Sequence, residues 1–197
     1  MKSRVQDLSK FTLPDNFRGR PGWFVQVWWL VQSTLFQLSP QFLYGWRRFL
    51  LRLFGARIGE GVLIRPSATI TYPWKVRIGD YSWIGDNAIL YSLGEIDIGA
   101  HSVVSQRSYI CTGSHDFKSA PFDIYASKIT IGDEAWIATD VFVAPGITIG
   151  HGTVVGARSS VFADLPPMMV CIGTPAKPIR PRNVEEKSEL CASLSMA

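Results

Sequence analysis

Aliphatic residues recur in this chain at intervals of six, and this period constrains the fold more than any other feature of the sequence. The repeat falls into five triplets: Ile58, Ile64, Ile70; Ile78, Ile84, Leu90; Ile98, Val104, Ile110; Ile131, Ile137, Val143; Ile149, Val155, Val161. A period of six matches neither the turn of an α-helix nor the alternation of a long strand. It indicates short strands that each end in a turn, so that three strands form one coil and the coils stack into an all-β solenoid.

Two further positions of the repeat support this interpretation. Glycine often follows the stacking residue, which suits a corner that is crowded or needs a positive φ: Gly59, Gly79, Gly85, Gly99, Gly132, Gly150, Gly156. Small or β-branched residues stand four positions after the stacking residue: Val62, Ala68, Ser82, Ala88, Ser102, Ser108, Ala135, Val141, Ile147, Thr153, Ser159. We expect these side chains to pack inside the coils, where room is limited.

The period is interrupted in two ways. The first three triplets start twenty residues apart, two more than three sixes, which predicts a small bulge at one corner of each coil. From Ile98 to Ile131 the step is thirty-three residues, which leaves an excursion of fifteen after Ile110, here taken as a loop over 114–128. A long loop on a regular rod is usually functional.

Composition excludes several classes of protein. The net charge of +4 arises locally, from six arginines between Phe17 and Arg57 with no acid among them, too sparse a set for a nucleic-acid site. The three cysteines are few and far apart, which favours a reducing compartment. The first sixteen residues lack the apolar core of a signal peptide, so we expect a cytoplasmic protein. No group of His, Cys and acids has metal-ligand spacing, so no metal is expected.

The flanking segments are predicted from apolar runs and breakers. Residues 1–57 form an aromatic-rich segment with two helices, Trp23–Leu38 and about Gln41–Phe54, before the repeat domain at 58–166 and a tail at 167–197. The tail is expected to leave the rod at its prolines and to be disordered from residue 185.

Two interpretations of the helices remain open, and both can hold. The helices cap the open end of the solenoid or pack on a neighbouring subunit, or they form a peripheral membrane anchor. In the second case aromatic and basic side chains face the lipid: Trp23, Trp28, Trp29, Trp46, Arg47, Arg48, Arg52.

Across residues 58–183 the chain resembles the hexapeptide-repeat acyltransferases, on the period of six, the run Cys111–Phe117 and the run Gly173–Arg180. The resemblance implies a left-handed parallel β-helix of about five coils. It also implies acetyl-CoA as co-substrate and a homotrimer with active sites between adjacent rods.

His115 opens the long excursion, directly after Ser114. Transfer of an acyl group to a hydroxyl needs a base, and imidazole serves near neutral pH. Similar enzymes carry a histidine at the start of this excursion, so the resemblance implies that His115 is the catalytic base. Asp116 is a candidate for orienting it or binding the acceptor. Which group orients His115 is left open.

The resemblance also places the two substrates. Coenzyme A is expected along the later coils, with Lys177 and Arg180 at its phosphates and Trp136 beside the thioester; the full donor set is Thr139, Ala157, Phe162, Ala163, Lys177, Arg180, Trp136. Sugar acetyltransferases of this type hold the acceptor with an asparagine and an aspartate, where this chain has Gly85 and Leu93. The acceptor pocket must therefore differ, and nearby polar candidates are Asp86, Asn87, Tyr91, Ser92.

The aromatic N-terminal segment, the Cys111–Asp116 run and the tail together resemble the colanic-acid type of O-acetyltransferase. We therefore expect an acetyltransferase of exopolysaccharide biosynthesis, acting on a sugar or lipid-linked sugar in the cytoplasm or at the inner face of the membrane. Two alternatives remain: an acetyltransferase for a soluble small molecule such as a serine, a drug or a nucleotide sugar, and a non-catalytic β-helix scaffold.

Overall fold

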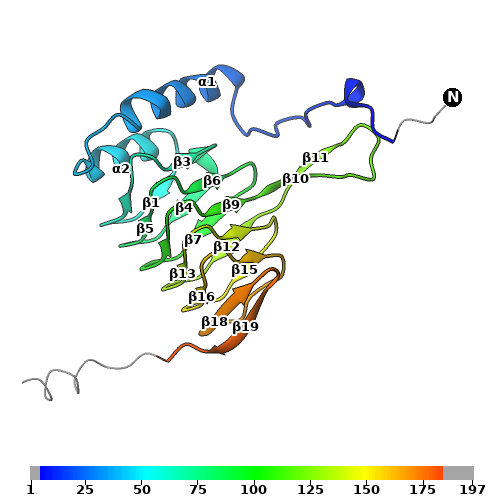
Figure 1. The fold of residues 1–197 in the computed structure, drawn as a ribbon. Coiled ribbons are helices and arrows are strands. Elements are labelled where there is room, and N and C mark those ends of the chain that lie inside the picture. The colour runs from blue at the N-terminus through cyan, green and yellow to red at the C-terminus, as the bar shows by residue number, and fades with distance from the viewer. Residues whose placement is uncertain (1–4, 184–197) are drawn as a thin grey trace, which may run out of the picture.

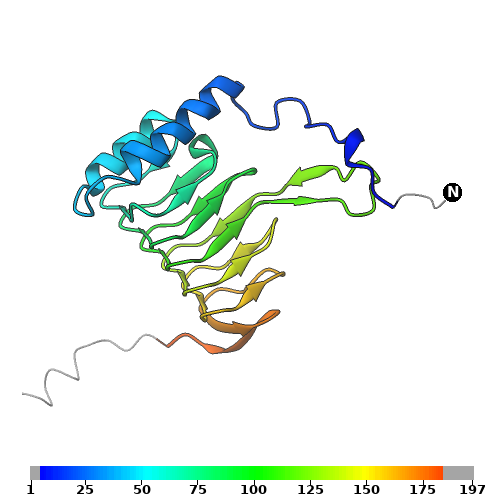
Figure 2. The same ribbon diagram turned by 45° about the horizontal axis from the view of Figure 1, so that its top comes forward.

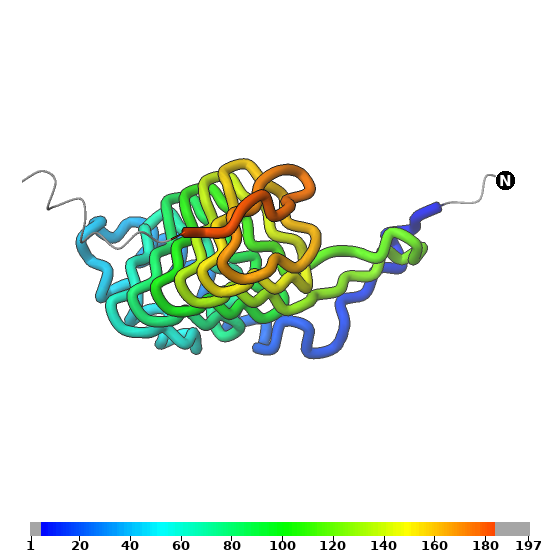
Figure 3. Tube along the Cα trace, turned by 90° about the horizontal axis from the view of Figure 1, so that it is seen from below, coloured from blue at the N-terminus to red at the C-terminus, as the bar shows by residue number. Residues whose placement is uncertain are grey.

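The computed structural model describes residues 5–183 and forms a parallel β-helix with three faces. Face 1 contains β1 (Arg57–Ile58), β4 (Val76–Ile78), β7 (Ile96–Ile98), β12 (Ile129–Ile131) and β15 (Thr148–Ile149). Face 2 contains β2 (Leu63–Ile64), β5 (Trp83–Ile84), β8 (Val103–Val104), β13 (Trp136–Ile137), β16 (Val154–Val155), β18 (Met169–Gly173) and β19 (Ala176–Pro181). Face 3 contains β3 (Thr69–Ile70), β6 (Ile89–Tyr91), β9 (Tyr109–Cys111), β14 (Phe142–Val143) and β17 (Ser160–Val161). Figures 1 and 3 show the stacked coils.

The period of six is confirmed as the repeat of the core. Every triplet residue is buried, and equivalent residues pair directly along the rod, as Ile58 does with Ile78 and Ile98 with Ile131. The thirty-three-residue step is therefore absorbed outside the stack. The predicted inner small residues are buried as well.

Inner serines link one coil to the next. The Ser82 hydroxyl donates to the Gly99 carbonyl at 2.7 Å and accepts from the Ser102 amide at 3.0 Å. The Ser102 hydroxyl repeats the pattern one coil further, donating to Gly132 at 2.8 Å. Buried hydroxyls thus find partners and add to the stacking, as buried polar groups must.

The corner glycines are present because the backbone is crowded there. A Cβ on Gly85 would lie 2.6 Å from the Gln106 amide nitrogen, and one on Gly132 would lie 2.6 Å from that of His151. Positive φ occurs instead at non-glycine corner positions such as Asn87 (55°). Of the two reasons offered for these glycines, close approach of neighbouring coils is the one that applies.

All insertions leave the rod at the corner between faces 3 and 1. The extra residues of the first coil fall in the connection that contains the 3-10 turn η3 (Pro73–Lys75), and those of the second fall within 92–95. The predicted loop 114–128 is largely an antiparallel hairpin, β10 (Gly113–His115) and β11 (Ile124–Ala126), called the arm below. The N-terminal segment, with the short η1 (Leu8–Lys10), runs along the arm (Figure 2), and the Asp7 amide donates to the Ala120 carbonyl at 2.7 Å.

Helices cover the N-terminal end of the rod (Figures 1 and 2). They are α1 (Gly22–Val31), the π-helical turn η2 (Gln32–Phe36) that continues it, and α2 (Tyr44–Leu53). Their inner side chains, Trp28 and Leu51 among them, join the core of the first coil. Among the described residues, no helix is long and apolar enough to cross a membrane.

The helices also satisfy the open edge of the first coil. Its carbonyls have no preceding coil to bond, and they accept instead from Arg47 (to Ile64, 2.7 Å), Arg48 (to Val62, 2.9 Å), Arg52 (to Ile58, 2.6 Å) and Trp28 (to Ile70, 2.8 Å). The capping interpretation is supported. The expectation that Trp28 and these three arginines face lipid is wrong, because Trp28 is buried and the guanidinium groups are directed at the rod.

The other end of the rod extends beyond the predicted boundary at residue 166. Leu165 pairs with Ile149, and β18 continues face 2 by pairing in parallel with β16. β19 folds back on β18. Residues 169–181 of the expected tail are therefore a hairpin that closes the rod, and the polar stretch 185–197 lies outside the described residues.

Substitution of Arg47 tests whether the helical cap stabilises the first coil. Its guanidinium is fully buried and bonded to Ile64, Pro40 and Ser39, and burial lowers its pKa. Arg47→Met should lower the free energy of unfolding by about 3 kcal/mol, since buried carbonyls lose their partners. Urea unfolding measures this, with the exposed Arg158→Met as the control that changes little. Equal stability of the two variants would contradict the capping role.

Candidate active site

His115 lies at the root of the arm, where β10 pairs it with Ile124 of β11. Its Nδ1 lies 2.8 Å from the Phe122 carbonyl oxygen. Because a carbonyl only accepts, this contact assigns the ring proton to Nδ1 and leaves the lone pair on Nε2. The orienting group, which the sequence left open, is a backbone carbonyl of the arm itself.

Phe122 holds the imidazole in a second way. The two rings stack with centroids 4.3 Å apart and an interplanar angle of 9°, and Phe11 of the N-terminal segment packs at 6.1 Å. Phe122 has a φ of 60°, a conformation that bulky residues rarely adopt. Such strain is often found at functional sites, and here it turns the carbonyl toward His115.

Asp116, expected to orient His115 or to bind the acceptor, lies in the turn of the arm. Its carboxylate accepts from the Lys118 amide at 2.9 Å and its side chain is exposed, so it closes the turn of the arm. His101 and His151 are exposed at corners, as predicted. Within residues 5–183 no group of three or more His, Cys, Asp or Glu could hold a metal ion.

Several predicted residues form one column along the corner between faces 2 and 3. This corner column consists, coil by coil, of Asp86–Asn87, Gln106–Arg107, Thr139–Asp140 and Ala157–Arg158, linked by the backbone bonds Arg107 to Asp86, Asp140 to Gln106 and Arg158 to Thr139. The Thr139 hydroxyl is bonded to Gln106 at 3.0 Å, while Ala157 is exposed. The structure thus brings together two acceptor candidates, Asp86 and Asn87, and two donor candidates, Thr139 and Ala157.

Face 2 carries a hollow of about 380 Å³ beside this column. It is lined by Tyr44, Arg65, Trp83, Ser105 and Gln106, among others. Trp136 closes it toward the later coils, with its indole N–H donating to the Ser105 hydroxyl at 3.0 Å. Sequence reasoning found Trp136 and missed Trp83. Both precede a stacking isoleucine, and strand alternation turns such residues outward.

The positions at which other sugar acetyltransferases carry an acceptor-binding asparagine and aspartate are Gly85 and Leu93 in this chain. Gly85 has no room for a side chain, as its contact with Gln106 shows, and Leu93 is buried against Gly113 at the root of the arm. Asp86 is bound by Arg65 at 2.7 Å and by Ser67 at 2.9 Å, while Asn87 is exposed. The asparagine and aspartate of other sugar acetyltransferases could not simply be restored here.

An aromatic ladder crosses face 3. Tyr91, Tyr109, Phe142 and Phe162 stack on successive coils with centroids 5.9, 6.0 and 5.8 Å apart. Burial raises the pKa of Tyr109 to about 12 and also raises that of Tyr91, so both phenols stay neutral. Ser92 is buried with its hydroxyl committed to the Tyr72 backbone, which keeps it from an acceptor.

The remaining donor candidates lie at the C-terminal end of the rod. Lys177 and Arg180 are exposed on β19, opposite Ile172 and Val170 of β18. Phe162 and Ala163 are exposed directly after β17. Lys177 and Arg180 thus extend face 2 past the last coil, while Phe162 and Ala163 lie at the corner between faces 3 and 1.

Within a single chain, His115 lies far from the corner column. The arm leaves at the corner between faces 3 and 1, the column follows the corner between faces 2 and 3, and the aromatic ladder lies between them. A six-residue side of the coil spans up to about 20 Å. Within one chain, His115 and the corner column therefore lie at opposite edges of face 3.

The chain was compared with protein-family models, curated proteins and solved structures. No protein-family model matches. The "Putative colanic acid biosynthesis acetyltransferase WcaF" of Escherichia coli K12 is 64% identical over 90% of this chain and 98% of that protein. The galactoside O-acetyltransferase of the same organism is 28% identical over 72% of this chain and 71% of that enzyme. A hexapeptide-repeat acetyltransferase from Vibrio cholerae, solved with acetyl coenzyme A, superposes with a TM-score of 0.73 at 25% identity, covering 86% of this chain and 89% of that one.

These relatives are acetyltransferases by name, and they do not support the alternative of a non-catalytic scaffold. The repeat, its register and the sequence identity agree with one another. The chain belongs to the hexapeptide-repeat acetyltransferases, enzymes built on a left-handed parallel β-helix, and it is of their colanic-acid type.

Proposed function

We propose that this enzyme transfers an acetyl group from acetyl-CoA to a sugar hydroxyl in exopolysaccharide biosynthesis of the colanic-acid kind. The bond between His115 Nδ1 and the Phe122 carbonyl carries the proposal, because it leaves Nε2 free to act as a base. The name of the 64% identical relative and the acetyl coenzyme A in the Vibrio cholerae structure support the pathway and the donor.

The proposed reaction is one direct transfer. Nε2 of His115 takes the proton of the acceptor hydroxyl as that oxygen attacks the thioester carbonyl carbon. A backbone N–H stabilises the resulting oxyanion. The carbon–sulfur bond then breaks, and the thiolate of coenzyme A takes the proton back from the imidazolium, which the Phe122 carbonyl stabilises in the meantime. The products are the acetyl ester and free coenzyme A.

An acyl-enzyme intermediate on Cys111 is disfavoured. Burial raises the pKa of this thiol, and its Sγ lies 3.2 Å from the Gly113 carbonyl oxygen. Since the thiolate is the nucleophilic form, a buried thiol with a raised pKa is inert.

The donor is proposed to lie along the corner column. Thr139 and Ala157 border the pantetheine arm, while Phe162 and Ala163, at the corner between faces 3 and 1, lie outside this column. Lys177 and Arg180 on β19 bind the phosphates through charge-assisted bonds. Trp136 lies beside the thioester.

The complete site is proposed to form between subunits of a homotrimer. The arm of one copy reaches the corner column of the next, which joins the two half-sites that one chain holds apart. Closed rotational symmetry makes all such contacts equivalent.

The acceptor is proposed to lie in the hollow of face 2. Trp83 offers an aromatic surface for a sugar ring, and Asn87 and Arg65 offer polar contacts at its edge, with Asp86 oriented by Arg65. Tyr91, on face 3, is kept as a further candidate for contact with the acceptor. Ser92 is left out because its hydroxyl is already bonded to the Tyr72 backbone. Asp116 stays a candidate on the arm, since its carboxylate is exposed. A lipid-linked sugar at the inner face of the membrane fits the proposed pathway.

His115→Ala should lower kcat for acetyl transfer by about 10²–10⁴-fold, because the general base is lost. Release of coenzyme A with a lipid-linked or nucleotide sugar measures this. The control is His151→Ala, which removes an exposed corner histidine and should leave kcat unchanged. Undiminished turnover in His115→Ala would remove the proposed base.

Subunit complementation tests the shared site. His115→Ala removes the base from every arm, and Ala157→Glu places a repelling carboxylate in every donor groove, so each variant alone should be inactive. Trimers co-expressed from both chains should regain about a quarter of wild-type activity, the share of interfaces that combine an intact arm with an intact column. Co-expression of two differently tagged His115→Ala chains is the control. No recovery in the mixed trimers would place the site within one chain.

Trp83→Ala should raise the KM for the acceptor about tenfold and leave the KM for acetyl-CoA unchanged, because an aromatic stacking contact is lost. Tyr81→Ala is a matched control, since Tyr81 and Trp83 are each 54% exposed while only Trp83 lines the hollow. A rise in the KM for acetyl-CoA alone would assign the hollow to the donor instead.

A further inference from the structure

Helix α1 is apolar on both of its sides. Val25 and Trp28 are buried against the rod, while Trp23, Val27 and Leu30 lie on the opposite side and are exposed. A surface helix of a globular protein is normally polar on its outer side. This outer side therefore has the composition of a contact surface.

The apolar surface continues beyond α1. Leu38 and Phe42, in the connection to α2, are 79% and 77% exposed. On α2, Trp46 and Phe49 stack on each other with centroids 5.7 Å apart, on the side away from the buried Arg47. The outer face of the cap, as we name it, consists of Trp23, Val27, Leu30, Leu38, Phe42, Trp46, Phe49, Leu53.

The outer face of the cap has no charged side chains at its centre, and the charged side chains around it are all positive. Residues 21–46 contain no charged side chain, and residues 16–59 contain no acid. Exposed apolar patches on soluble proteins mark contacts with proteins or membranes. A partner for this face must therefore be apolar at its centre and negative, or neutral, at its rim.

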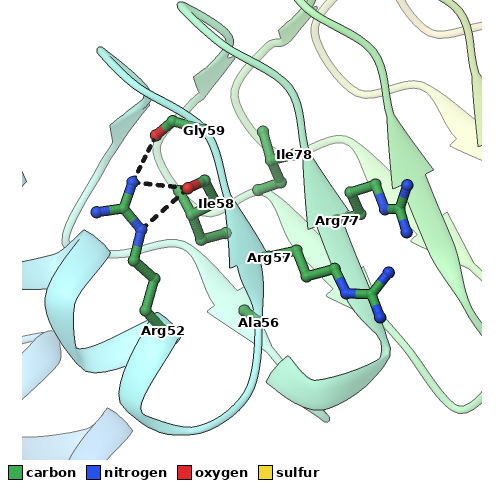
Figure 4. Close-up of a pocket in the computed structure, with 7 residues that line it drawn as sticks. All are labelled: Arg52, Ala56, Arg57, Ile58, Gly59, Arg77 and Ile78. Carbon is green, nitrogen blue, oxygen red and sulfur yellow. Dashed lines mark hydrogen bonds between the residues drawn. The ribbon is translucent and has the colours of Figure 1, made fainter.

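Cations gather where face 1 meets the cap. β1 and β4 place Arg57 directly beside Arg77, an arrangement that is unfavourable for like charges unless an anion joins them. Figure 4 shows both side chains extending away from Arg52, which is turned to the carbonyls of Ile58 and Gly59. Among the described residues Arg57 makes no ion pair.

Arg20 joins these two arginines in a hollow of about 320 Å³. The acids that line its far end are already engaged: Asp97 by Lys128 at 2.5 Å and by Arg77 at 3.9 Å, and Glu95 by Lys128 at 3.8 Å. Arg20 and Arg57 are thus left for an external anion, which Arg77 can share because its contact with Asp97 is long.

We propose that the outer face of the cap docks on the surface of a bilayer that contains anionic phospholipid. Its aromatic and aliphatic side chains enter the interface, and Arg20, Arg57 and Arg77 bind lipid phosphates at the edge of the contact. Apolar area with adjacent cations is the combination that binds anionic membranes. The proposed contact is peripheral; no described helix is long and apolar enough to cross the bilayer. This contact is separate from acyl transfer and does not depend on the proposed acceptor.

Flotation of the purified full-length protein with vesicles tests the proposal. Protein should float with phosphatidylcholine vesicles that contain phosphatidylglycerol, float far less with phosphatidylcholine alone, and be released by added salt. Leu30→Glu/Phe42→Glu should remain at the bottom of the gradient. Arg57→Gln/Arg77→Gln should bind about 25-fold more weakly, at about fivefold for each cation.

Matched controls separate this contact from general effects. Val5→Glu alters an apolar residue away from the cap that is even more exposed than Leu30 and Phe42, and Arg158→Gln removes an exposed arginine from the far end of the rod. Both variants should float as the wild type does. Failure of the wild type to bind phosphatidylglycerol vesicles, or normal flotation of Leu30→Glu/Phe42→Glu, overturns the proposal. A lower mass of this variant by light scattering would assign the face to a second copy of the chain and would also overturn it.

Discussion

The open edge of the first coil is the constraint on which the rest of the structure depends. Each later coil bonds its backbone to the coil before it, but the carbonyls of Ile58, Ile64 and Ile70 have no coil before them. Unpaired polar groups beside a buried core are costly, so a solenoid needs a cap at this edge. Arginine and tryptophan supply it here because their N–H groups reach carbonyls while their stems and rings cover apolar area. The cap thereby uses the arginines that a membrane contact could otherwise have used, and leaves that role to Arg20, Arg57 and Arg77.

The stacking of the coils also restricts where the chain can carry inserted residues, and so where a functional loop can lie. A strand that pairs on both sides tolerates no insertion, so extra residues accumulate at one corner, between faces 3 and 1. The first two coils use it for short turns and the third for the arm. The root of the arm is fixed by the stacked Tyr109–Cys111 strand, and its tip is tied to the N-terminal segment through Asp7 and Ala120. A rigid rod thus presents the imidazole of His115, the proposed base, at the foot of a braced hairpin.

The period of six was enough to predict the fold, the core residues and the position of His115, because one short repeat determines burial, register and corner geometry together. It could not predict the partner of His115, since the Phe122 carbonyl is set by a backbone conformation that no side-chain pattern encodes. The sequence also missed Trp83 and the ladder from Tyr91 to Phe162, because outward positions carry no periodic constraint. The hairpin of β18 and β19 was predicted as a tail because its prolines suggested that the chain leaves the rod.

The stiffness of the rod connects the two proposals. β9, which carries the arm, lies two coils from β3 at the capped end, a distance of about 10 Å at the spacing of paired strands. The helical layer adds about 10 Å. A cap that lies on a bilayer therefore holds His115 about 20 Å above the lipid surface and keeps it there, because stacked coils do not bend toward the membrane. That height suits an acceptor hydroxyl displayed several sugar units from a membrane-bound carrier, and it would exclude the sugar attached directly to the lipid. The position of the arm along the rod would then select the acceptor by its distance from the membrane. No side chain in the pocket would be needed for that selection.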